Sequence, residues 1–274
     1  MSRFLILFLL LVVCGCSPHT NHSCRYHYLA KVKECERSSV QFNGEGDHFL
    51  VVLVDARHLD YSSPAGYLST LQSLCSSQEP HTGHAWIILS GKRGGEPWIF
   101  EGGHTGEFGR LAPRYFDEML RLSRNKDPNP AQYLFSPLPD GQLEIGSGGH
   151  LPTFAAAFPV TEEGFARIMR LFEADGYDFS QWGLRGPHCV HFVLSCLACV
   201  GIDIFCQEQV QLPASFSFEG ERIDLWIDSA YSTLTTQTPE LLEQRLVEHV
   251  SEGRALVATA WYRSWCLEKD KSGK

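Results

Sequence analysis

The central helix of the protein is predicted by the sequence Gly186-Pro187-His188-Cys189-Val190-His191-Phe192-Val193-Leu194-Ser195-Cys196-Leu197-Ala198-Cys199-Val200-Gly201. From Val190 onward, apolar residues recur at i, i+3, i+4 and i+7, the spacing that places one apolar stripe on a helix. Pro187 suits the first helical position, and Gly201 suits the left-handed residue that follows the last turn. The sequence therefore predicts a helix that begins at Pro187 and ends before Gly201.

This helix places Cys189 in its first turn. The free N–H groups and the positive end of the helix dipole stabilise a thiolate there, so we expect the pKa of the thiol to be lowered. A lowered thiol pKa is what a cysteine nucleophile requires. A buried apolar cysteine is the ordinary alternative. The first-turn position and the flanking His188 and His191 favour the nucleophile.

Length and composition set the broad class. The chain has 274 residues, which fits one domain with appendages, and 43% hydrophobic and 12% aromatic residues are enough for a large core. The formal net charge is −9 and there is no basic run. Because nucleic-acid binding depends on clustered positive charge, we exclude a nucleic-acid partner.

The N-terminus is typical of an export signal. Arg3 precedes an apolar run over 4–13, which is too short to span a bilayer as a helix. The following Val13-Cys14-Gly15-Cys16-Ser17 resembles the bacterial lipobox, with Val13 in place of the usual leucine. The resemblance implies a signal peptide over 1–15, a lipid on Cys16, and a membrane-anchored lipoprotein of the bacterial cell envelope that faces the periplasm or the exterior. An ordinary secretory signal is the alternative.

The remaining chain divides into a polar tether over 16–47 with at most a short helix, a catalytic domain over 48–267 and a polar tail over 268–274. Because strands in hairpin order mix with flanking helices, we expect an α+β fold with an antiparallel sheet packed against helices. Residues 207–236 are expected to be irregular. We expect strands at 48–56, 84–89, 98–101, 133–138, 153–158 and 255–262, and helices that begin near residues 63, 113, 161, 187 and 238.

Ten cysteines in an exported chain favour disulfides. Lipidation would use Cys16, cleavage would remove Cys14, and catalysis would keep Cys189 free. An odd number then remains, so at least one further thiol stays free or pairs between molecules. These remaining residues are Cys24, Cys35, Cys75, Cys196, Cys199, Cys206 and Cys266.

A thiol nucleophile requires a base and a third group that orients the base. His84 is the candidate base because it opens a predicted strand, where it would be held rigidly. If residues 84–101 form one hairpin centred near Arg93, Glu101 lies opposite His84. Cross-strand neighbours have Cβ atoms about 4.5 to 5.5 Å apart, close enough for the carboxylate to bind the imidazole.

Three motifs resemble the permuted papain-like amidases of the bacterial YaeF/YiiX type, relatives of the NlpC cell-wall peptidases. They are Thr82-Gly83-His84-Ala85-Trp86-Ile87-Ile88-Leu89, Trp98-Ile99-Phe100-Glu101 and His188-Cys189-Val190-His191-Phe192-Val193. The resemblance implies a circularly permuted papain-like fold, with Cys189 as nucleophile, His84 as base and Glu101 as orienting group. It implies no cofactor. Lecithin:retinol acyltransferase shares the permuted order but has a second histidine where Glu101 stands here.

Three further residues are candidates for supporting roles. The position before the nucleophile is usually Asn in this family and is His188 here, which either donates to an oxyanion or, as we prefer, lines the cleft. Tyr177 resembles a tyrosine at a similar offset in NlpC-type enzymes, although a core tyrosine fits equally well. His104 competes with Glu101 for the third position.

The substrate is not fixed by these residues. A peptide or peptidoglycan-stem amide is preferred, and acyl transfer or thioesterase action on lipid shares the same acyl-enzyme step. A non-catalytic surface lipoprotein is the other alternative. We expect no metal site, since His81 and His84 would face opposite ways on a strand and no Cys-x-x-Cys pair recurs.

Overall fold

The computed structural model describes residues 19–60, 63–75, 82–106, 111–218 and 220–272. The predicted signal peptide over 1–15 and the predicted lipidation residue Cys16 lie outside these ranges. The helices are α1 (His19–Ser38), α2 (Pro64–Cys75), α3 (Leu111–Arg124), α4 (Glu162–Arg170), α5 (Cys189–Cys199), α6 (Pro239–Ser251) and α7 (Thr259–Ser272), with 3₁₀ turns η1 (Pro130–Phe135) and η2 (Ser229–Tyr231). The strands are β1 (Phe49–Asp55), β2 (His84–Arg93), β3 (Glu96–Gly106), β4 (Gly141–Ile145), β5 (Phe154–Pro159), β6 (Glu208–Gln211), β7 (Ser215–Phe218), β8 (Glu221–Asp224), β9 (Thr233–Thr236) and β10 (Leu256–Val257).

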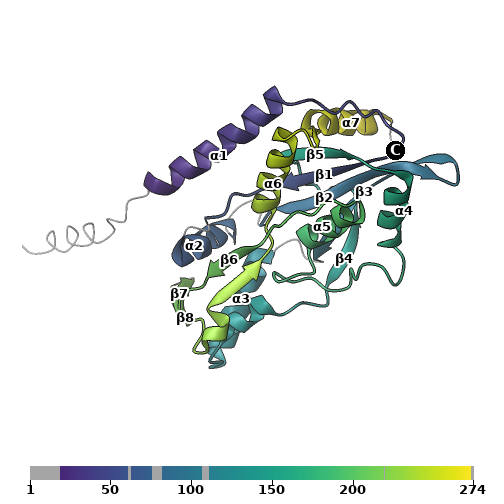
Figure 1. The fold of residues 1–274 in the computed structure, drawn as a ribbon. Coiled ribbons are helices and arrows are strands. Elements are labelled where there is room, and N and C mark those ends of the chain that lie inside the picture. Colours follow the sequence, from purple (N-terminus) through teal and green to yellow (C-terminus); the bar gives the residue numbers. More distant parts are fainter. Residues whose placement is uncertain (1–18, 61–62, 76–81, 107–110, 219, 273–274) are drawn as a thin grey trace, which may run out of the picture.

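A six-stranded antiparallel sheet forms the centre of the molecule, in the order β10-β5-β1-β2-β3-β4 (Figure 1). The sheet and its flanking helices confirm the predicted α+β class. All residues of β1 are buried, which explains why its sequence is continuously apolar rather than alternating. Strands buried on both faces require helices on both faces, and the chain supplies them.

The two faces of the sheet carry different helices. Helices α4, α5 and α6, with the end of α1, pack on the face that contains Ala85, Ile87 and Leu89. Helix α7 packs on the opposite face, which contains Trp86 and Ile88 (Figure 1). A side chain on β2 therefore meets α5 or α7 according to its place in the alternation.

A second hydrophobic cluster lies beside the sheet and is built from α2, α3 and the short strands between α5 and α6. Residues 207–236, expected to be irregular, contain two small antiparallel pairs, β6–β9 and β7–β8. Their inward residues, among them Val210, Ile223 and Leu234, are almost fully buried. Strands of this length carry too few alternating positions for the sequence pattern to reveal them.

The prediction of a polar tether over 16–47 with at most a short helix is wrong for much of that range, because α1 is a 20-residue helix. Val32 and Cys35 are buried in the core, and the Tyr28 hydroxyl donates to Glu243 of α6 over 2.5 Å. Residues 28, 32 and 35 share one face of a helix, so a narrow apolar stripe in a polar sequence is enough to dock it.

The C-terminal segment also differs from the prediction. The strand expected over 255–262 is only two residues long, and α7 follows it and continues through most of the expected polar tail to Ser272. The Thr259 hydroxyl accepts a hydrogen bond from the Ala155 N–H at the start of this helix. Tyr262 then packs on Trp86, so tertiary contacts outweigh the strand preference of the sequence. The strand expected over 133–138 is likewise replaced by the turn η1, which begins at Pro130.

Candidate active site

Helix α5 begins two residues later than predicted. His188 is its N-cap, and Cys189 is the first helical residue. Val190 and Val193 are fully buried, which confirms the apolar stripe. Gly201 follows the helix with φ +77°, the left-handed conformation that the sequence predicts.

The thiol of Cys189 lies in a buried position, with the residue only 6% exposed. The nearby backbone N–H groups of Ala85 and Val190 lower the pKa of the thiol, but burial outweighs them and raises this pKa to about 11. The negative charge of Glu240 raises the pKa further. The lowered pKa expected from the helix terminus is therefore wrong for the free protein, because desolvation of the thiolate is the larger effect. The resting thiol is protonated.

The β2–β3 hairpin has a different register from the one expected. Arg93 pairs with Glu96 around a two-residue turn, and Glu101 pairs with Ile88. The turn residues Gly94 and Gly95 have φ +62° and +88°, as a type I′ turn requires at both central positions. The two glycines therefore move the hairpin centre beyond Arg93, and the predicted pairing of His84 with Glu101 is wrong.

Glu101 binds groups on α7 instead. Its carboxylate accepts a hydrogen bond of 2.7 Å from the Tyr262 hydroxyl and lies 3.2 Å from the Lys269 ammonium. Both partners belong to the helix on the opposite face of the sheet from α5. The structure therefore does not bring Glu101 to Cys189 or to His84.

His84 lies at the start of β2, and its side chain shares the sheet face of Trp86, opposite the face that packs on α5, so the structure does not bring its ring to Cys189. Its ring stacks on Trp86 and on His150, with ring centroids 5.7 and 4.6 Å apart. Asp55 is its direct neighbour on β1 and accepts a 2.9 Å hydrogen bond from the His150 ring. The sequence analysis did not identify Asp55 or His150. For Asp55, the available signal was an acidic residue at the end of an apolar strand. For His150, nothing in the sequence indicates a position beside His84.

His104 lies on the α5 face of β3, in a fully buried position. Its Nδ1 lies 3.0 Å from the Tyr177 hydroxyl, which also lies 3.2 Å from Nδ1 of His191 and donates to the His188 carbonyl over 3.4 Å. Burial lowers the pKa of His104 to about 4, although nearby backbone carbonyls partly oppose this shift. The structure thus brings together Cys189, Tyr177, His188 and His104 at the start of α5.

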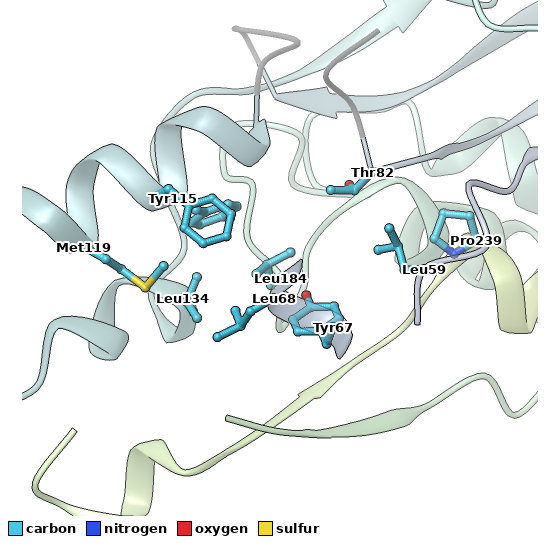
Figure 2. A pocket seen from close by; sticks show the side chains of 10 residues that line it. Leu59, Tyr67, Leu68, Thr82, Tyr115, Met119, Leu134, Leu184 and Pro239 are labelled. Carbon is cyan, nitrogen blue, oxygen red and sulfur yellow. The ribbon is translucent and has the colours of Figure 1, made fainter. Parts of the chain in front are cut away.

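An apolar pocket, whose lining side chains are shown in Figure 2, lies in the second hydrophobic cluster, across the ring of Trp182 from this group of residues. The ring of Trp182 is the link, because its centroid lies 6.3 Å from the His188 ring and 6.3 Å from the ring of Tyr115, which lines the pocket. Thr82, two residues before His84, lies at the pocket's other side. The lining residues, which are almost all apolar, are Leu59, Tyr67, Leu68, Thr82, Tyr115, Phe116, Met119, Leu134, Leu184 and Pro239.

The remaining points concern metal ligands, membrane-spanning helices and the state of the cysteines. Within the described ranges, no three His, Cys, Asp or Glu side chains converge as metal ligands would. His81, one of the histidines weighed as a ligand, lies outside the described residues. Among helices that the structure describes, none is long and apolar enough to cross a bilayer. The cysteines with described side chains are free thiols, namely Cys35, Cys189, Cys196, Cys199, Cys206 and Cys266.

Comparison of the chain with protein-family models, with curated proteins and with solved structures finds no match.

Proposed function

We propose that the protein is a thiol hydrolase that forms an acyl-enzyme on Cys189. The observation that carries this proposal is the position of the sulfur. It lies in the first turn of α5, near the backbone N–H of Ala85, and directly follows the buried His188. A merely structural buried cysteine requires neither the N–H group nor the histidine.

The reaction follows from the protonation states. Because the resting thiol is protonated and the His104 imidazole is neutral, the thiol proton moves to a histidine only as the substrate carbonyl is attacked. The sulfur–carbon bond forms while the carbonyl electron pair moves to oxygen. The histidine then returns its proton to the leaving group, and water hydrolyses the thioester by the reverse sequence.

Two histidines of the β2–β3 hairpin are candidates for this proton transfer. His84 is the base that the family resemblance implies, but its ring lies on the Trp86 face of the sheet, so its action on Cys189 would require the ring to move to the α5 face. His104 shares the sheet face of Cys189 and takes the place proposed for Glu101. Lecithin:retinol acyltransferase, which shares the permuted order, also has a second histidine, but at the position of Glu101 and not three residues further on, where His104 stands.

Amide bonds of peptides or peptidoglycan stems are the first proposed substrate. The alternative, acyl transfer or thioester hydrolysis on lipids, is favoured by a specific observation, the apolar pocket shown in Figure 2, which the ring of Trp182 separates from His188. Such a pocket can bury an aliphatic chain. In either case, the permuted papain-like fold, the lipid on Cys16 and the location at the bacterial membrane belong to the proposal.

Hydrolysis assays with variant proteins test this function. The wild type is incubated with cell-wall stem peptides and, separately, with acyl lipids, and the products are identified by mass. Cys189→Ala should abolish turnover, and His84→Ala or His104→Ala should lower it by about 100-fold or more. Cys196→Ala is the matched control, since this cysteine lies two turns further along the same helix. Full activity of Cys189→Ala would exclude the proposal.

A further inference from the structure

The side chain of His188 caps α5 in an unusual way. Its Nδ1 accepts a 3.2 Å hydrogen bond from the Val190 N–H, one of the free donors of the first turn. A ring nitrogen that accepts a hydrogen bond cannot carry a proton. The cap therefore fixes the tautomer, and Nε2 carries the hydrogen as long as the ring is neutral.

The ring stays neutral because it is buried. His188 is only 4% exposed, and burial lowers its pKa to about 3, with the neighbouring His191 and His104 acting in the same direction. At physiological pH, the side chain is then a neutral Nε2–H donor held in a fixed orientation.

This donor has no acceptor within the described part of the chain. Nε2 of His188 is buried and makes no hydrogen bond there. An unsatisfied buried donor destabilises the folded state, so its presence requires a reason. The ring stands directly before Cys189 and contacts Trp182 on the side of the apolar pocket. The donor and the thiol belong to adjacent residues at the start of α5.

We propose that the Nε2–H of His188 donates to the substrate carbonyl oxygen as Cys189 attacks, so that His188 is a catalytic residue of the oxyanion site. This inference rests on the proposed function. When the sulfur–carbon bond forms, the carbonyl electron pair moves to oxygen, and the donor stabilises the resulting charge without transferring its proton. A neutral imidazole held at a helix N-terminus can polarise a carbonyl in this manner. The cleft-lining role preferred from the sequence is thereby replaced.

The test separates acylation from alkylation. Acylation of Cys189 by p-nitrophenyl acetate develops an oxyanion, whereas alkylation by iodoacetamide does not. His188→Asn retains a cap, since the Asn oxygen can accept from the Val190 N–H, but its shorter side chain keeps the amide N–H donors away from the position of Nε2. We expect acylation to slow by about 100- to 1000-fold, while alkylation and the thermal midpoint stay close to wild type. His188→Ser, a second good cap, should behave in the same way.

Controls make the outcomes distinct. His249→Asn alters a histidine that lies near the C-terminal end of α6 and contacts Arg254, and it should leave both rates unchanged. The ratio of acylation in His188→Asn to wild type should also be constant between about pH 5 and pH 9, because a neutral ring does not titrate there. The role of His188 would be overturned if His188→Asn were acylated at the wild-type rate. It would also be overturned if acylation and alkylation of His188→Asn fell by the same factor. Unchanged acylation in Cys189→Ala would instead overturn the proposed function itself.

Discussion

The pKa of Cys189 determines when the thiol reacts. Because burial raises this pKa to about 11, the free protein should be alkylated slowly at neutral pH. The rate with iodoacetamide, read by peptide mass, should rise about tenfold per pH unit through the alkaline range. Cys206, with its pKa raised to about 12 by burial, should react more slowly still. A rate for Cys189 that is already constant at mildly acidic pH would contradict the buried, protonated thiol.

Glu101 should contribute to stability rather than to catalysis. Its carboxylate binds Tyr262 and Lys269 on α7, so Glu101→Gln keeps an acceptor for the hydroxyl but loses the ion pair. Chemical denaturation should show a loss of about 1 kcal/mol, since the Lys269 ammonium is partly exposed. Hydrolysis should remain within about twofold of wild type. A large loss of activity with unchanged stability would show that the carboxylate orients a catalytic group.

At the scale of elements, two glycines set the register of the β2–β3 hairpin. A side chain added at Gly94 would meet nothing within 4 Å, so only its backbone conformation, φ +62°, opposes substitution. Gly94→Asn should be tolerated because Asn enters the left-handed region readily. Gly94→Val should cost about 1 to 2 kcal/mol in the free energy of unfolding, measured by denaturant titration. Equal stability of the two variants would be inconsistent with the type I′ turn.

Several helices and one strand were correctly predicted from the sequence. Helices α4, α5 and α6 were predicted because each has an N-cap or proline start and an apolar stripe, and β1 because it is a continuous apolar run. The first turn of α5 therefore places Cys189 from sequence alone. The hairpin register was not predicted, since placing the turn at Gly94 and Gly95 rather than near Arg93 moves every cross-strand partner.

Helix α7 was not predicted from the sequence. Its first residues include Trp261 and Tyr262, which favour strands, and the helix is stabilised by contacts with Trp86 and Glu101 that are distant in sequence. Likewise, the group formed by His104, Tyr177 and His188 depends on how β3 and α5 pack together. Local patterns cannot supply such contacts, and the candidate site was therefore only partly visible in the sequence.

At the scale of the whole molecule, a buried carboxyl group connects α1 to the core. Glu243 is fully buried, accepts hydrogen bonds from Tyr28 and Thr153, and has a pKa raised to about 7, mainly by burial. Because its pKa is higher in the folded than in the unfolded state, its contribution to stability is complete below about pH 4.5 and is lost as pH rises through about 7. The loss should amount to roughly 3 kcal/mol.

Unfolding titrations across this pH range check the role of Glu243. Glu243→Gln keeps both hydrogen-bond partners but cannot ionise, so its free energy of unfolding should depend less on pH than that of the wild type. Glu248→Gln, an exposed change on the same helix, should keep the wild-type dependence. The assignment fails if Glu243→Gln shows the same pH dependence as the wild type.

The most direct test of the account is the covalent state of Cys189 during turnover. Wild-type protein is mixed with an acyl donor, quenched in acid within the first turnover, and analysed by intact mass and peptide mapping. We predict one acyl group per chain, located on Cys189, and no adduct in Cys189→Ala. An acyl group on another residue, or product formation by Cys189→Ala at the wild-type rate, would contradict the account.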